Sequence, residues 1–163
     1  MTTLFVDADA CPVTREALDC ARKANIPCVI AGNSTQNLMR HVRHSDPTQP
    51  PADGGFWVRK LQVGIDADSA DFAIVCELNP EDVVVTQDIG LASIVLGRGA
   101  RAIGVRGRVY DPLTIDSMMF IRHEEKKVRR AGGRTKGPSA FANEDRKRFV
   151  RNLRSLVQEA MDS

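Results

Sequence analysis

The chain has 163 residues and a mass of 17.9 kDa, about the size of one domain and long enough to bury a core. A hydrophobic content of 42%, 12 glycines and a formal net charge of +2 exclude a wholly disordered chain, a collagen and a coiled coil. The four cysteines contain no C-x-x-C pair and no histidine is placed to complete a zinc site, so neither a disulfide scaffold nor structural zinc is predicted.

The first third of the chain alternates apolar runs with a helical pattern. Residues 4–6, Leu-Phe-Val, predict a strand, and Pro12 suits the first turn of the helix that follows. Asn25 and Pro27 end that helix. The next segments in chain order are a strand at residues 28–31, a short helix at 34–43 and a loop at 44–55 that is rich in proline and glycine.

The middle of the chain continues the same alternation. Residues 83–85, Val-Val-Val, are uniformly apolar, which is typical of a parallel strand buried on both faces. The expected segments in chain order are a strand at 57–63, a helix at 70–78, a strand at 83–85, a helix at 90–96 and a strand at 102–105. Strands that alternate with helices predict an α/β fold, a three-layer doubly wound parallel sheet with right-handed crossovers.

Two further helices are expected at 115–128 and 144–161, joined by a basic, glycine-rich segment at 129–138. Residues 122–154 hold twelve Lys or Arg against four Asp or Glu, a net charge of +8, so the rest of the chain carries −6. This separation predicts a basic C-terminal surface that can meet a polyanion. The alternative is a pair of solvated helices with ordinary ion pairs, such as Glu125 with Arg129.

Carboxylates follow the strands at places where a parallel α/β sheet binds ligands, beyond the carboxyl ends of its strands. Three chain segments supply them: the end of the first strand, the start of the helix at 70–78, and the end of the fourth strand. The residues are Asp7 and Asp9, then Asp66, Asp68 and Asp71, and finally Asp88. Each aspartate taken singly also suits a helix N-cap.

Gathered together, these side chains predict a divalent cation. Two carboxylates about 4 Å apart repel by roughly 4 kcal/mol at an effective dielectric near 20, so a bare cluster is costly. Oxygen ligands without His or Cys favour Mg²⁺ or Mn²⁺ over zinc. Such an ion activates water and stabilises the charge on a displaced oxygen. An acidic metal site beside a basic surface therefore predicts hydrolysis of phosphodiesters.

At these residues the sequence resembles the PIN-like nuclease superfamily, whose pattern is an Asp ending the first strand, an Asp within a middle helix, and T-x-D after the fourth strand. Phe5-Val6-Asp7, the run from Ala70 to Ile74, and Thr86-Gln87-Asp88 occupy those places. The whole chain is similar to the uncharacterised bacterial YaiI/YqxD family. That similarity lies in Val6-Asp7-Ala8-Asp9-Ala10-Cys11-Pro12, Ser69-Ala70-Asp71, Thr86-Gln87-Asp88 and Gly132-Gly133-Arg134-Thr135-Lys136-Gly137-Pro138.

The resemblance implies a single PIN-like domain over residues 1–163, with 113–163 a basic helical extension of it. It implies a nuclease, and we expect RNA as the substrate in preference to DNA. The implied catalytic residues and metal ligands are Asp7, Asp71 and Asp88, with Asp9 assisting. Thr86 is expected to orient a ligand. The residues expected to bind the phosphates of a nucleic acid are Arg129, Arg130, Arg134 and Lys136.

Two alternatives stay open. The Asp7-Ala-Asp9 motif also resembles the first motif of haloacid-dehalogenase-like phosphatases, in which the first Asp is a nucleophile and the second a general acid. The other alternative is a non-catalytic module that binds nucleic acid through its basic surface, without metal and with a steep salt dependence.

The N-terminal sequence has no basic segment followed by an apolar stretch, so no export signal is predicted. Apolar runs fall far short of the roughly 18 residues that span a bilayer. We therefore expect a cytoplasmic protein with no membrane partner.

Overall fold

The computed structural model describes residues 1–9, 11–33, 37–64, 69–135, 137 and 139–163. Its strands form one five-stranded sheet in the order β3-β2-β1-β4-β5. The bounds are β1 (Leu4–Asp7), β2 (Cys28–Asn33), β3 (Val58–Val63), β4 (Val83–Val85) and β5 (Arg101–Ile103). Every neighbouring pair is parallel, which confirms the predicted α/β fold with a parallel sheet.

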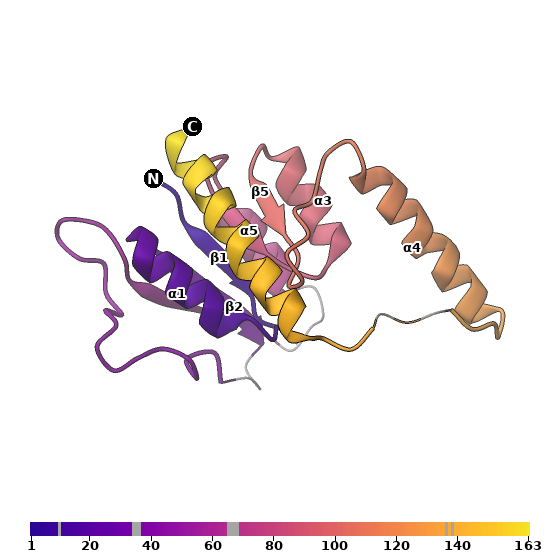
Figure 1. The fold of residues 1–163 in the computed structure, drawn as a ribbon, viewed down its shortest axis with the longest axis horizontal. Helices are drawn as coiled ribbons and strands as arrows, with labels where there is room; N and C mark the ends of the chain where they lie inside the picture. Colours follow the sequence, from indigo (N-terminus) through magenta and orange to yellow (C-terminus); the bar gives the residue numbers. More distant parts are fainter. Residues whose placement is uncertain (10, 34–36, 65–68, 136, 138) are drawn as a thin grey trace.

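Helices cover both faces of this sheet (Figure 1). Their bounds are α1 (Thr14–Ala24), α2 (Ser69–Glu77), α3 (Ile89–Gly97), α4 (Ile115–Arg130) and α5 (Asn143–Asp162). Helices α1 and α5 share one buried cluster with the sheet, and α2 and α3 share the other. Burial on both sides explains why the three valines of β4 show no alternation of apolar and polar residues.

The direction of side chains along β1 decides which helices the first aspartate faces. Leu4 and Val6 belong to the cluster under α1 and α5, whereas Phe5 belongs to the cluster under α2 and α3. Because side chains alternate along a strand, Asp7 is directed to the same side as Phe5. The end of β1 therefore presents Asp7 toward α2 and α3.

The predicted short helix at 34–43 is wrong over the residues described, 37–43, which form turns. Leu38 packs into the core, and the backbone N–H of Arg43 donates to the carboxylate of Asp46 at 2.8 Å. Asp46 in turn accepts two hydrogen bonds from Arg22 of α1, at 2.9 and 2.7 Å. These ties to the body of the protein hold the segment in turns.

The two C-terminal helices differ in how they meet the body. In α5, Phe149 and Leu153 are fully buried against the sheet and α1. Helix α4 leans away from the body, and Ile115 is its one buried residue (Figure 1). The description of residues 113–163 as a basic helical extension is not confirmed, because α5 forms part of the layer that covers the sheet.

No helix within the described ranges is both long enough and apolar enough to cross a membrane.

We expect Phe149→Ala to lower the free energy of unfolding by about 3–5 kcal/mol, the usual cost of removing a buried phenylalanine from a core. Phe120→Ala is the matched control, because the side chain of Phe120 on α4 is 64% exposed. Urea denaturation of the two variants measures the difference. Equal, small losses would mean that α5 is not part of the folded core.

Candidate functional site

The aspartates at the ends of β1 and β4 and the one in α2 meet in a single pocket, called here the acidic pocket, of about 420 Å³. Its lining residues are Asp7, Asp9, Asp71, Gln87, Asp88, Ile89 and Arg122. The structure thus brings Asp7, Asp9, Asp71 and Asp88 together around one pocket, as the sequence predicted for their positions. Asp66 and Asp68 lie outside the described residues.

Thr86 fixes the carboxylate of Asp7. The Thr86 hydroxyl donates to Oδ2 of Asp7 at 2.8 Å and accepts the backbone N–H of Asp88 at 3.0 Å. The backbone of Thr86 is held as well, because its N–H donates to Ile103 at 3.0 Å and its carbonyl accepts the hydroxyl of Tyr110 at 3.1 Å. Thr86 is fully buried, and the side chain that its hydroxyl orients is that of Asp7.

Asp7 is buried and only partly satisfied. Its Oδ1 atom and the Oδ1 atom of Asp9 are buried without a hydrogen-bond partner. Burial raises the pKa of Asp7 above its ordinary value; the hydrogen bond from Thr86 opposes this shift, and the nearby charge of Asp9 adds to it. An orphaned, buried carboxylate oxygen costs folding energy unless a partner is supplied.

Asp88 serves α3 as well as the pocket. It is the N-cap of that helix, and its Oδ1 accepts the backbone N–H groups of Gly90 at 2.8 Å and Leu91 at 3.3 Å. The absence of a side chain at Gly90 leaves room here, since a Cβ would lie 3.1 Å from Oδ1 of Asp88. The capping role that the sequence allowed for Asp88 is confirmed, and it coexists with a place in the pocket.

Asp71 and Asp88 form a close acidic pair that lines the acidic pocket. Burial acts to raise the pKa of Asp88. The contact with Asp71, the N–H groups of Leu91 and Gly90, and the charge of Arg122 outweigh burial and lower that pKa.

Arg122 is a site residue that the sequence analysis missed. It projects from α4, and its Nη1 lies 3.4 Å from Oδ1 of Asp88. Arg122 is one of twelve basic residues in a 33-residue stretch, and no motif distinguishes it from the others. Tyr110, which supports Thr86, was also missed: it is the only tyrosine in the chain, but it belongs to no motif and its contact with Thr86 joins residues 24 positions apart.

The predicted phosphate-binding residues lie elsewhere. Arg129, Arg130 and Arg134 sit at or just beyond the end of α4, and none of them lines the acidic pocket. Lys136 is outside the described residues. Arg129 also pairs with Glu125 at 3.9 Å, as the alternative of ordinary ion pairs predicted.

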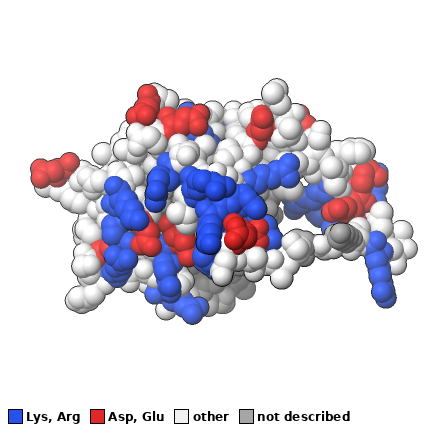
Figure 2. Space-filling model, in the orientation of Figure 1, with Lys and Arg blue, Asp and Glu red and all other residues white. Residues whose placement is uncertain are grey.

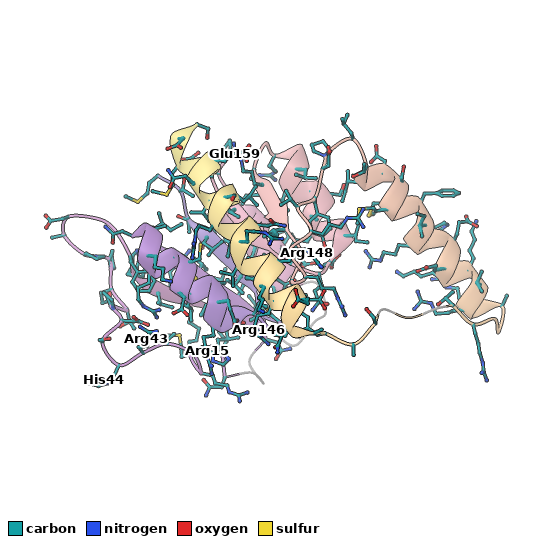
Figure 3. All side chains as sticks on the ribbon, in the orientation of Figure 1. Arg15, Arg43, His44, Arg146, Arg148 and Glu159 are labelled. Carbon is teal, nitrogen blue, oxygen red and sulfur yellow. The ribbon has the colours of Figure 1, made fainter. Side chains whose placement is uncertain are left out.

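A second basic surface covers α5 and the neighbouring α1 (Figure 2). Figure 3 labels Arg15 of α1 with Arg146 and Arg148 of α5 on this face. Acidic side chains offset part of its charge: Arg146 pairs with Glu16 at 2.6 Å and Arg148 with Asp145 at 3.2 Å. The basic charge that the sequence placed in one region is therefore divided between α5 and the end of α4.

The acidic pocket offers carboxylate oxygens, which are the ligands that a hard divalent cation prefers. All four candidate ligands are carboxylates, and the unpartnered oxygens of Asp7 and Asp9 are the groups that a cation would satisfy. Among the described residues, however, no three His, Cys, Asp or Glu side chains are already arranged to hold a metal ion. Neighbouring carboxylates such as Asp71 and Asp88 could both reach one such ion, because the oxygen ligands of Mg²⁺ lie close to one another around it.

A model of a bacterial protein family, described as "Uncharacterized BCR, YaiI/YqxD family", matches residues 5–159. A UPF0178 protein of Heliobacterium modesticaldum is 36% identical over 158 residues, covering 96% of this chain and 97% of its own length. A UPF0178 protein of Bacillus velezensis is 36% identical over 155 residues, covering 95% of this chain and 84% of its own. No solved structure gives a significant match.

We expect Asp7→Asn to raise the free energy of unfolding of the metal-free protein at neutral pH. Because burial raises the pKa of Asp7, the folded state binds this proton more tightly than the unfolded chain does. The charged form of Asp7 therefore lowers stability above its ordinary pKa of 3.8, and this effect vanishes as the pH falls below that value. The gain from Asn should shrink in the same way.

Urea denaturation in EDTA, repeated from neutral to acidic pH, measures this gain. Asp53→Asn is the matched control, since Asp53 is an exposed carboxylate in the loop before β3. A loss of stability in Asp7→Asn at neutral pH would show that the Asp7 charge is a structural requirement.

Proposed function

The chain belongs to the uncharacterised bacterial YaiI/YqxD family, and we propose that it is a Mg²⁺- or Mn²⁺-dependent phosphodiester hydrolase, a PIN-like nuclease that acts on RNA. The observation that carries the proposal is the acidic pocket, where carboxylates from β1, α2 and the end of β4 meet one arginine. Asp7 at the end of β1, Asp71 in α2 and Thr86-Gln87-Asp88 after β4 support the PIN-like placement.

In this proposal Asp7, Asp71 and Asp88 hold the cation and Asp9 assists. When bound, the ion supplies an activated water and stabilises the charge that develops on the leaving oxygen. Thr86 keeps one oxygen of Asp7 in place, which leaves the unpartnered Oδ1 for coordination.

Arg122 is the basic residue among those that line the acidic pocket. Its guanidinium group can donate two parallel hydrogen bonds to the non-bridging oxygens of a phosphodiester, a geometry that an ammonium group does not offer. Bound there, the phosphate is held beside the carboxylates. The basic residues at the end of α4 would contact phosphates farther along the strand.

A first experiment incubates the protein with end-labelled single-stranded and duplex RNA and DNA in Mn²⁺, with an EDTA control. We expect cleavage of RNA that falls to the EDTA background in Asp88→Asn. Asparagine is as good an N-cap as aspartate, so this variant removes the charge and keeps the start of α3. Asp53→Asn, which changes an exposed carboxylate, should retain full activity.

Full activity of Asp88→Asn would show that the site assignment is wrong. Binding without cleavage, insensitive to metal, would instead support the non-catalytic module. Hydrolysis of small phosphate monoesters in place of polynucleotides would support the phosphatase alternative.

We further expect the double change Arg134→Ala and Lys136→Ala to weaken RNA binding without sequence preference. Loss of two phosphate contacts should flatten the slope of log affinity against log salt by roughly 1.4, since each contact to a single strand contributes about 0.7. Filter binding at several salt concentrations gives this slope. Arg151→Ala with Arg154→Ala removes the same charge from α5 and is the matched control. Equal effects of the two pairs would indicate a diffuse field in place of local contacts.

A further inference from the structure

A second hollow of about 560 Å³, called here the side pocket, opens next to the acidic pocket. The two pockets share three lining residues, Asp71, Asp88 and Arg122, which form a common rim between them. Beyond that shared rim the side pocket has an apolar wall. Its members come from α2, α3 and α4, and include Phe72, Val75, Leu91, Ile94 and Met119.

Two of these apolar side chains are unusually open to solvent. Phe72 is 72% exposed and Ile94 is 48% exposed. Single exposed apolar residues are common on protein surfaces, but here two of them line one hollow beside a group of charged residues. Phe72 directly follows Asp71, a candidate metal ligand, in α2.

We propose that the side pocket binds the nucleobase of the nucleotide whose phosphate occupies the acidic pocket. This inference rests on the proposed function, because it names a part of the substrate of the same site. A base offers a flat π-face that stacks on an aromatic ring whatever its sequence. The exposed ring of Phe72 provides such a surface, Ile94 adds apolar contact, and Arg122 stands between the base and the phosphate.

The size and the rim of the side pocket favour a nucleotide over a second protein chain. Its volume falls within the roughly 300–1,000 Å³ that small ligands occupy. The rim consists of two carboxylates and an arginine, whereas the core of a protein interface is typically depleted of charged residues. A polynucleotide presents both kinds of group within one nucleotide, a charged phosphate and an apolar base.

The test compares the binding of adenosine 5′-monophosphate, adenosine 3′-monophosphate and ribose 5-phosphate in Mg²⁺ by calorimetry. We expect at least one of the two nucleotides to bind about fivefold or more tightly than ribose 5-phosphate, the lower end of what stacking one base contributes. Phe72→Ala should abolish this preference and leave the affinity for ribose 5-phosphate unchanged. Phe72→Trp, which keeps a stacking surface, should retain the preference.

Phe120→Ala is the matched control, because Phe120 is 64% exposed on α4 and lines neither pocket. Equal affinity of the wild-type protein for nucleotides and ribose 5-phosphate would overturn the inference, as would a preference that survives in Phe72→Ala. Sedimentation of the wild-type protein and of Phe72→Ala tests whether a second copy of the chain occupies the side pocket instead. If Phe72→Ala converts a dimer into monomers, the side pocket is covered by a second copy and the inference is wrong.

The cleavage assay separates failure of this inference from failure of the proposed function. If both hold, Phe72→Ala raises KM for an RNA oligonucleotide about fivefold or more while kcat is kept. Metal-dependent cleavage by a protein that binds nucleotides no more tightly than ribose 5-phosphate would overturn only the proposal that the side pocket binds a nucleobase. The opposite result is a protein that cleaves no substrate but prefers nucleotides to ribose 5-phosphate through Phe72. It would overturn the proposed nuclease activity and support the nucleotide site.

Discussion

The hydrogen bond from Thr86 to Asp7 joins the ends of β4 and β1, the two neighbouring strands at which the order of the strands along the sheet reverses. The connection from β1 runs to β2 on one side, whereas β4 lies on the other, so ligands are expected at the gap between β1 and β4. At that gap Thr86 uses its hydroxyl, its N–H and its carbonyl, bonding to Asp7, Asp88, Ile103 and Tyr110. One buried threonine therefore ties two candidate ligands to the sheet.

The acidic pocket remains electrostatically unsatisfied around this fixed point. Oxygens of Asp7 and Asp9 are buried without partners, and the carboxyl groups of Asp71 and Asp88 line the same pocket. A structural role would be served better by fewer charges or by more arginines, because a protein gains no stability from crowding carboxylates together. Such departures from good packing and pairing are typical of sites that act on a ligand.

The sequence predicted the sheet, the positions of its strands and the meeting of four aspartates, because these depend on local patterns and on one general rule of α/β folds. It could not predict the turns at 37–43, which depend on the distant pair of Arg22 and Asp46. Nor could it find Arg122, since reaching Asp88 depends on the path of α4 beside α3 and not on neighbouring residues. The charge count treated α4 and α5 as one basic unit, whereas packing separates them.

The double duty of Asp88 bears on how this position can vary among related chains. For folding alone, Asn, Ser or Thr would start α3 nearly as well as Asp, because each offers an oxygen to the N–H groups of Gly90 and Leu91. For a cation, only a carboxylate brings the needed charge. Under the proposed function, natural variation at residue 88 therefore separates two selective pressures: small polar replacements would mark lineages that kept the helix start and lost the cation site.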